Sequence, residues 1–353
     1  MRRAIEDAHS SSFVTAFILS SSGRLRKSRF GCFEVEALTG RILDLPGDLF
    51  MIRIVGTVLA GLLGLAFGSF LNVCLSRWPE GESVVKPRSH CRKCGRTLAW
   101  WENVPVVSWV ALRGRCRTCG VRIGWRYPAV ELTVGVLWAF TIWRVLPEML
   151  SPNLSLTQAP MIYLYESGLD LALGRMILYW SLIALAVLDA EHLWLPNWIT
   201  LPGIGFGILL NSSHFVLADC LAEGPNIGVA GTFTVSILGE IGPPLVAGGL
   251  ILLIRWIYWL VRRREGIGLG DAKLMAMLGA WLGFSGALLS FGIGVVAGAL
   301  FALMMLAIPE TRRESAAWLA AKLPLGTFLC IGGIISAFWG QPMIDAYKRW
   351  AGF

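Results

Sequence analysis

The sequence predicts an all-α polytopic membrane protein with about eight transmembrane helices and a small cytoplasmic zinc-ribbon-like domain between helices 1 and 2. Three observations lead to this prediction. Hydrophobic residues make up 55% of the chain and charged residues only 15%, whereas soluble domains carry about 25% charged residues. Several apolar runs approach the roughly 20 residues that a membrane-spanning helix needs. Finally, the excess positive charge lies in one loop, which also contains four paired cysteines.

Eight apolar runs are the candidate transmembrane helices. They cover residues 52–75, 128–146, 173–190, 198–217, 240–261, 272–284, 286–308 and 322–340. The run at 272–284 is short, because a helix rises only about 1.5 Å per residue and would cross just part of the hydrocarbon layer. The seven runs after the first are expected to form one transmembrane domain, residues 128–345.

The distribution of charge predicts the orientation of these helices. The loop from Arg77 to Tyr127 has eleven Lys and Arg residues and three Glu residues, so it carries the whole net charge of +8. Basic loops face the cytoplasm, and counting spans from there places residues 190–197, 262–264 and 309–322 on the same side. The sequence thus predicts a multi-pass protein of the cytoplasmic membrane. The basic side chains are expected to contact anionic lipid headgroups rather than nucleic acid.

Residues 1–50 do not fit this pattern. They are polar and mixed in charge and show no apolar periodicity, so they are expected to be a poorly ordered N-terminal extension. Translation is expected to start at Met51, which makes residues 51–76 the first transmembrane helix. The basic loop, residues 77–127, follows this helix directly.

Four cysteines in the basic loop form two pairs, Cys91-x-x-Cys94 and Cys116-x-x-Cys119, with 21 residues between the pairs. Two such pairs can supply four thiolates to one tetrahedral Zn²⁺ ion. Free thiols and disulfides are the alternatives, although disulfides are rare in the cytoplasm. A site closed by four cysteines leaves no position for water, so the predicted zinc is structural rather than catalytic.

Two aspartates lie where apolar runs meet the cytoplasmic side. Asp189 ends the third run, and Asp271 begins the sixth, directly after the glycine-rich turn that contains Gly266, Gly268 and Gly270. Ionisable groups at the membrane boundary indicate function, and two carboxylates at the same depth indicate one shared site. Two adjacent carboxylates that share a proton are the machinery of an aspartic protease. The glycines would let a substrate strand approach closely.

Each of these acids also has a structural interpretation. Asp271 follows glycines and precedes an apolar helix, which is typical of an N-cap residue. Asp189 could be a hydrated carboxylate at the membrane interface. Glu131 follows Pro128 and is expected to be an acid in the first turn of a helix, where the helix dipole favours negative charge.

Several ordered segments resemble the type IV prepilin peptidases, which are membrane enzymes of the GxGD aspartic protease kind. These segments are "GSFLNVCLSRWP" at 68–79, the two cysteine pairs, "RYPAVEL" at 126–132, "LDAEHLWLPNWITLP" at 188–202, "GIGLGDAKL" at 266–274 and "LPLGTFL" at 323–329. The resemblance extends over most of the chain.

The resemblance implies a specific activity. The two catalytic aspartates of the family fall on Asp189 and Asp271. The family removes the basic leader of type IV prepilins and type II secretion pseudopilins after a glycine, at the cytoplasmic face of the bacterial inner membrane. Many members then methylate the new N-terminal amine with S-adenosylmethionine. Their cysteine domain accompanies methylation and can bind zinc, so both activities are expected here.

Three other functions remain open from the sequence. A peptidase without methyltransferase activity would belong to the same family. A proton-coupled transporter could use the aspartates as a relay, but it would leave the glycine turn and the cysteines without a role. A zinc-ribbon scaffold that recruits partners to the membrane would need neither aspartate for chemistry.

Overall fold

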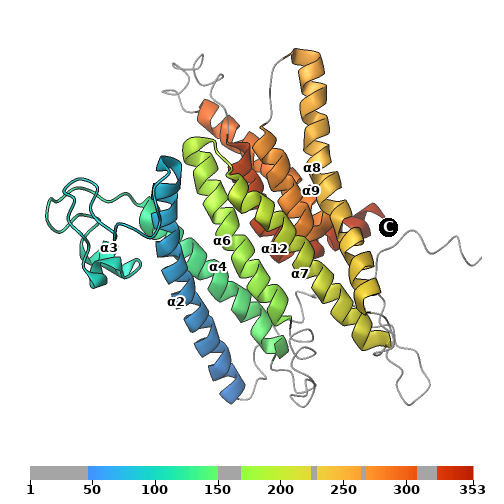
Figure 1. Cartoon of the computed structure of the whole chain (residues 1–353), viewed down its shortest axis with the longest axis horizontal. Coiled ribbons are helices and arrows are strands. Elements are labelled where there is room, and N and C mark those ends of the chain that lie inside the picture. The colour runs from blue at the N-terminus through green and yellow to red at the C-terminus, as the bar shows by residue number, and fades with distance from the viewer. Residues whose placement is uncertain (1–46, 150–167, 224–228, 264–267, 308–323, 353) are drawn as a thin grey trace, which may run out of the picture. The chain divides into compact units, whose positions relative to one another are not determined.

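A computed structural model describes residues 47–149, 168–223, 229–263, 268–307 and 324–352 (Figure 1). Within these ranges helices are joined by loops, and the only pairing of extended backbone consists of two isolated β-bridges. The long helices are α2 (Gly47–Arg77), α4 (Arg126–Met149), α6 (Leu169–His192), α7 (Asn197–Glu223), α8 (Val229–Arg262), α9 (Leu269–Ala307) and α12 (Leu325–Ala351). The predicted all-α fold is therefore confirmed.

The number of described membrane-spanning helices differs from the eight that were predicted. Six of them, α2, α4, α6, α8, α9 and α12, are long and apolar enough to cross a membrane. The runs at 272–284 and 286–308 both belong to α9, which departs from helical geometry at Gly283 with φ 70° and ψ 176°. A glycine tolerates this backbone conformation without strain. The short run is thus one arm of a kinked helix rather than a separate thin span.

The predicted N-terminal extension lies mostly outside the described residues. The first described helix begins at Gly47, four residues before Met51. The start of translation at Met51 remains a prediction. At the other end of the chain, residues 341–353 belong to a different compact unit from residues 45–340, and α12 continues through them to Ala351.

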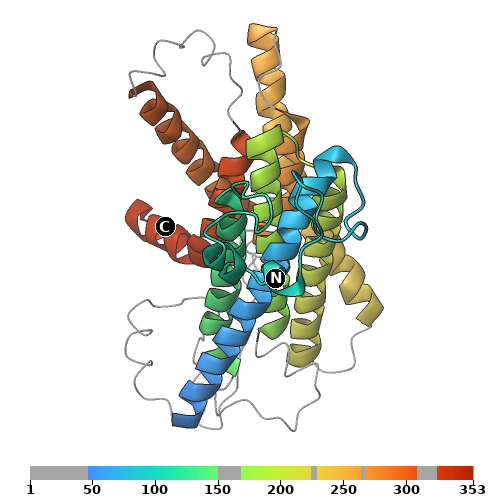
Figure 2. The same ribbon diagram turned by 90° about the vertical axis from the view of Figure 1, so that its left-hand side faces the viewer.

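Helices α2 and α4 pack closely because glycines line their contact (Figure 2). A Cβ atom added at Gly68 would lie 2.7 Å from the Cα atom of Glu131, and one added at Gly135 would lie 2.9 Å from Leu65. Small residues allow such close approach between membrane helices, where the hydrophobic effect does not drive helices together. This contact fixes the end of α2 beside the beginning of α4, which are the two points where the cysteine domain is attached.

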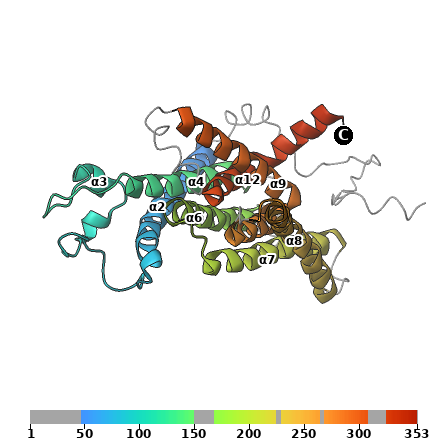
Figure 3. The same cartoon turned by 90° about the horizontal axis from the view of Figure 1, so that it is seen from above.

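The main apolar core joins α6, α8, α9 and α12. Buried residues of this core come from all four helices: Leu178, Leu182, Leu185, Ala247, Ile251, Leu274, Met275, Leu278, Leu329 and Cys330. Seen from above, α6 lies among α4, α7 and α12 (Figure 3). The core therefore holds the C-terminal end of α6 beside the N-terminal ends of α9 and α12.

The cysteine domain is a compact loop structure at the C-terminal end of α2 (Figure 1). It contains the short helices η2 (Trp78–Glu80), η3 (Trp100–Asn103) and α3 (Val107–Ala111). Arg77 is buried at its entrance and donates hydrogen bonds to the carbonyl oxygens of Ser83 and Pro87, at 2.8 and 2.7 Å. These bonds fold the chain back over the end of α2.

Candidate active site and metal centre

Asp189 lies in the last turn of α6 and is buried, with 6% of its surface exposed. Its Oδ2 atom accepts a hydrogen bond from the backbone N–H of Thr327 at 2.7 Å, and the Thr327 hydroxyl lies 3.2 Å from the same oxygen. Thr327 belongs to the first turn of α12. Helix N-termini favour negative charge, because their N–H groups have no partner within the helix. The N-terminus of α12 therefore offsets part of the cost of burying the Asp189 carboxylate.

Asp271 is the third residue of α9 and is also buried, with 9% exposed. It is not an N-cap, because α9 begins at Leu269. Instead, its Oδ2 atom accepts a hydrogen bond from the backbone N–H of Gly268 at 3.2 Å. This is the position and the contact of the acidic residue in a capping box. Asp271 thus caps the helix, as its structural interpretation predicted, but from the third helical position and not from the N-cap. This capping bond uses only one of its two carboxylate oxygens.

Three residues connect the two carboxylates. A Cβ atom added at Gly326 would lie 2.9 Å from Asp189 Oδ2 and 3.0 Å from the side chain of Leu195, and one added at Gly270 would lie 3.1 Å from Leu195. Gly326 therefore lies against both Asp189 and Leu195, and Gly270, which directly precedes Asp271, lies against the same leucine. The structure therefore brings both aspartates to one place at the same end of the helix bundle. The backbone N–H groups of Thr327 and Gly268 both bind the Oδ2 atom of their aspartate.

The glycines of the predicted turn have separate roles. Gly268 supplies the N–H that binds Asp271, and Gly270 makes room for Leu195. Gly266 lies outside the described residues. Gly326 and Thr327 contact Asp189 from a distant segment, and neither residue was predicted to belong to the site. The available signal was the segment "LPLGT", since a proline just before an apolar helix marks a helix N-terminus at this side of the membrane.

The four cysteines converge as predicted. Their sulfur atoms all lie within 4.8 Å of one another, and Cys91 Sγ is 3.7 Å from Cys119 Sγ. Tetrahedral zinc with Zn–S bonds of about 2.3 Å places its sulfur ligands about 3.8 Å apart. A disulfide would need about 2.05 Å. The arrangement therefore fits one Zn²⁺ ion and does not fit the disulfide alternative.

The two cysteine pairs have the same backbone geometry. The N–H of Cys91 bonds to Arg96 O at 2.9 Å, and the N–H of Cys116 bonds to Val121 O at 2.8 Å. The residue after each second cysteine is a glycine, and both Gly95 and Gly120 have φ of +69°, a conformation that favours glycine. Backbone N–H groups of Cys119 and Thr118 lower the pKa of Cys116 to about 6. The loop thus favours the thiolate at Cys116, the form that binds metal, whereas burial and the neighbouring thiols raise the pKa of Cys119 to about 11.

A buried ion pair stabilises the same domain. Glu102 accepts hydrogen bonds from Arg96 and from the backbone N–H of Ala99, both at 2.7 Å, and its side chain is 1% exposed. These contacts lower the pKa of Glu102 below its ordinary value of 4.5. The stabilisation is therefore present above that value, and it is lost only as the pH falls through the lower pKa of the folded protein.

We expect Glu102→Gln to speed amide hydrogen exchange in the cysteine domain at least about tenfold, because it weakens buried hydrogen bonds to a charged group. The effect should be equal at pH 6 and pH 8, since Glu102 is ionised at both. Glu80→Gln is the matched control. Glu80 pairs with Arg92 at 2.8 Å, but both side chains are about half exposed, and such pairs contribute little. An equal effect of both variants would contradict the prediction.

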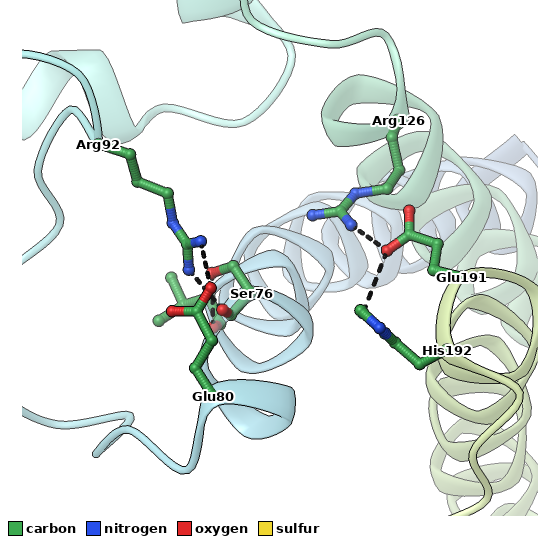
Figure 4. A network of polar contacts seen from close by, with 7 residues as sticks. Ser76, Glu80, Arg92, Arg126, Glu191 and His192 are labelled. Carbon is green, nitrogen blue, oxygen red and sulfur yellow. Dashed lines mark hydrogen bonds and ion pairs between the residues drawn. The ribbon is translucent and has the colours of Figure 1, made fainter.

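Polar contacts attach the cysteine domain and α4 to their neighbours (Figure 4). Arg92 bonds to Glu80 and to the carbonyl oxygen of Ser76 at the end of α2. Arg126, at the beginning of α4, forms an ion pair with Glu191 at the end of α6. The metal centre and the aspartates are therefore at the same end of the helices.

Comparisons with known proteins give a consistent result. Residues 62–145 match the model of the bacterial peptidase A24 N-terminal domain, and residues 176–303 match the type IV leader peptidase family. A prepilin leader peptidase/N-methyltransferase of Pseudomonas aeruginosa is 31% identical over 316 residues, which covers 83% of this chain and 93% of the relative. One from Burkholderia pseudomallei is 34% identical over 306 residues, covering 79% and 84%. No solved structure gives a significant match.

Proposed function

Because the chain belongs to the type IV leader peptidase family, we propose that Asp189 and Asp271 are the catalytic pair of its peptidase activity. The protein is a multi-pass enzyme of the bacterial inner membrane, a prepilin leader peptidase with N-methyltransferase activity. The finer proposal is that it cleaves type IV prepilins and type II secretion pseudopilins after a glycine, at the cytoplasmic face. It then methylates the new N-terminal residue with S-adenosylmethionine.

One observation carries the proposal for the aspartates. Gly326, which lies against Asp189, and Gly270, which precedes Asp271, both lie against Leu195, and each buried aspartate uses its Oδ2 atom to bind a backbone N–H. A purely structural acid needs no second acid beside it, because like charges repel. A shared proton removes this repulsion and produces one ionised and one neutral carboxylate.

The hydrogen bonds suggest how the two roles are divided. Asp189 accepts the N–H of Thr327 at the N-terminus of α12 at 2.7 Å, whereas Asp271 accepts the N–H of Gly268 at 3.2 Å. The Thr327 hydroxyl donates to the carbonyl oxygen of Ala186 at 2.9 Å and lies 3.2 Å from Asp189 Oδ2. We therefore assign the ionised role to Asp189, which takes a proton from water as the water oxygen attacks the scissile carbonyl carbon. Asp271 holds the shared proton and transfers it to the carbonyl oxygen as the tetrahedral diol forms. Breakdown of the resulting tetrahedral diol transfers a proton to the leaving amine and releases the leader.

The location of the pair suits a substrate that is itself a membrane segment. The proposal that this end of the helices faces the cytoplasm is supported by the basic loop, because basic loops favour that side. An apolar pilin stem lying among the helices would bring the bond just outside the bilayer to the aspartates.

The test is incubation of the purified enzyme with a prepilin and S-adenosylmethionine, with cleavage and methyl transfer measured separately. The proposal expects both. Cleavage without methylation would identify a peptidase that lacks the transferase activity. Absence of cleavage by folded protein would overturn the proposal.

A methyl group at Gly326 tests the position of Asp189. We expect Gly326→Ala to lower the rate of cleavage at least about tenfold, because the added Cβ would lie 2.9 Å from Asp189 Oδ2 and displace it; misplacement of a catalytic group by about 1 Å can cost roughly 10²-fold. Gly249→Ala is the matched control, since nothing lies within 4 Å of a Cβ at that helical glycine. A cleavage rate in Gly326→Ala equal to that of the control would contradict the assigned position.

A further inference from the structure

The turn between α6 and α7 places one leucine side chain beside both aspartates. Leu195 lies against Gly270, since a Cβ atom added at that glycine would be 3.1 Å from the Cβ and Cδ1 atoms of Leu195. A Cβ atom added at Gly326 would be 3.0 Å from Leu195 Cδ1 and 2.9 Å from Asp189 Oδ2. The leucine side chain therefore lies between the residue that precedes Asp271 and the residue that contacts Asp189.

Leu195 is at the edge of the main apolar core and not inside it. It packs against this core, whose members Leu274 and Leu278 are fully buried, but Leu195 itself is only partly buried. One part of its side chain thus belongs to the core, and another part is accessible to a molecule that approaches the aspartates.

Hydrogen bonds hold the turn that carries this leucine. Leu193 has φ 50° and ψ 42°, and its backbone N–H binds the carbonyl oxygen of Asp189 at 2.9 Å. The carbonyl oxygen of Pro196 accepts hydrogen bonds from two backbone N–H groups in the first turn of α7, both at 3.2 Å. Asn197 Oδ1 accepts a hydrogen bond from Lys273 Nζ of α9 at 2.7 Å. The turn is thus bonded to α6, α7 and α9, so its leucine has little freedom to move aside.

The proposed chemistry places the substrate in the same space. The scissile carbonyl group has to lie between the two aspartates, because one activates the water and the other protonates the carbonyl oxygen. The Cα atom of the residue before the cut is bonded directly to the attacked carbon, so any Cβ atom of that residue would lie close to the carboxylates. Leu195 already occupies space there, and extra carbon atoms fit poorly into a closely packed site.

We propose that Leu195 is the residue that restricts cleavage to a bond preceded by glycine. Its side chain takes the space that a substrate Cβ atom would need, whereas a glycine lets the carbonyl group reach the aspartates. The inference rests on the proposed function, and it adds which residue of the enzyme selects the substrate. Leu195 is a specificity-determining residue and not a catalytic one, because it acts by excluding side chains.

Cleavage of two prepilins tests the proposal. The second prepilin differs from the first only in having alanine in place of the glycine before the cut, and kcat/KM is measured for each with the full-length enzyme in lipid nanodiscs. The ratio of the alanine to the glycine value should rise at least about tenfold in Leu195→Ala, since one methylene group changes the selection by an apolar site roughly 10- to 200-fold. Both values come from one preparation, so a loss of folded enzyme does not change the ratio.

Two further variants accompany this measurement. Leu201→Ala is the matched control, because it makes the same change at a leucine of α7 that is 52% exposed, and it should keep the wild-type ratio. Leu195→Val removes less of the side chain and should raise the ratio by a smaller factor than Leu195→Ala. A residue that precedes a proline has an extended backbone, which the branched side chain of valine tolerates.

Each other result has a definite meaning. An unchanged ratio in Leu195→Ala, or equal cleavage of both prepilins by the wild type, would overturn the proposal. Loss of all cleavage in both Leu195→Ala and Leu195→Val would also overturn it, because the leucine would then be needed for the structure of the site and not for selection. If the wild type does not cleave even the glycine prepilin, the proposed peptidase function itself fails.

Discussion

Replacement of either Asp189 or Asp271 by asparagine is expected to reduce kcat for prepilin cleavage by at least about 10⁴-fold. Losses of this order follow when one member of a catalytic unit is removed. Asparagine cannot take a proton from water or hold the shared proton, yet it has almost the shape of aspartate and can still accept the backbone hydrogen bonds of Thr327 and Gly268. The loss would therefore be chemical and not structural, and it is measured by the rate of leader removal from a purified prepilin.

The control for these variants is Asp345→Asn, which makes the same change at an aspartate of α12 in the other compact unit. It should cleave at the wild-type rate. Methylation of a pilin supplied already cleaved should continue in Asp189→Asn and Asp271→Asn, because methyl transfer to an amine does not need the carboxylate pair that activates water. Near-normal cleavage by either variant would remove that residue from the catalytic pair.

Replacement of a zinc ligand is expected to have the second large effect. Cys116→Ala should lower the zinc content of the purified protein from about one ion per chain to below about one-tenth. A structural zinc contributes on the order of 10 kcal/mol to the folding of a small domain, and the described part of the domain has no strands and only short helices. Limited proteolysis should then cut this variant between residues 78 and 125, whereas the wild-type protein should resist cleavage there.

Cys74→Ala is the comparison, because Cys74 is 1% exposed in α2 and lies outside the metal centre. It should retain zinc and protease resistance. Leader cleavage should survive in Cys116→Ala, since the core of α6, α8, α9 and α12 holds the aspartates without any residue of the cysteine domain. Full zinc content in Cys116→Ala would show that these cysteines do not form the site.

The sequence predicted the features that depend on local composition. Long apolar runs become helices wherever a chain crosses a bilayer, because backbone groups cannot remain unpaired there. The spacing of the two cysteine pairs predicted their convergence, since each pair needs only a tight turn. The distribution of basic residues placed Asp189, Asp271 and the cysteines at one end of the helices.

Features that depend on contacts between distant segments were not predictable in this way. The partner of Asp189 is Thr327, 138 residues away, and no local pattern identifies that contact. Two apolar runs that looked separate in the sequence belong to one helix that is kinked at Gly283. The sequence contains many glycines, and nothing in it shows which of them adopts a positive φ angle. Glu131 is the sixth residue of α4, so the prediction that it is a first-turn acid is wrong. It is buried, and its Oε2 atom accepts a hydrogen bond from the backbone N–H of Val106 at 2.7 Å, which depends on how the cysteine domain folds back onto α4.

The central claim is that Asp189 and Asp271 act as one unit, and the double variant Asp189→Asn/Asp271→Asn tests it most directly. Its rate of prepilin cleavage is measured beside those of the two single variants in the same membranes. When two groups act as one unit, removing the second costs little once the first is gone. The double variant should therefore cleave no more than about tenfold more slowly than either single variant. If each single variant keeps measurable cleavage and the two losses multiply in the double variant, the aspartates act independently and the account is wrong.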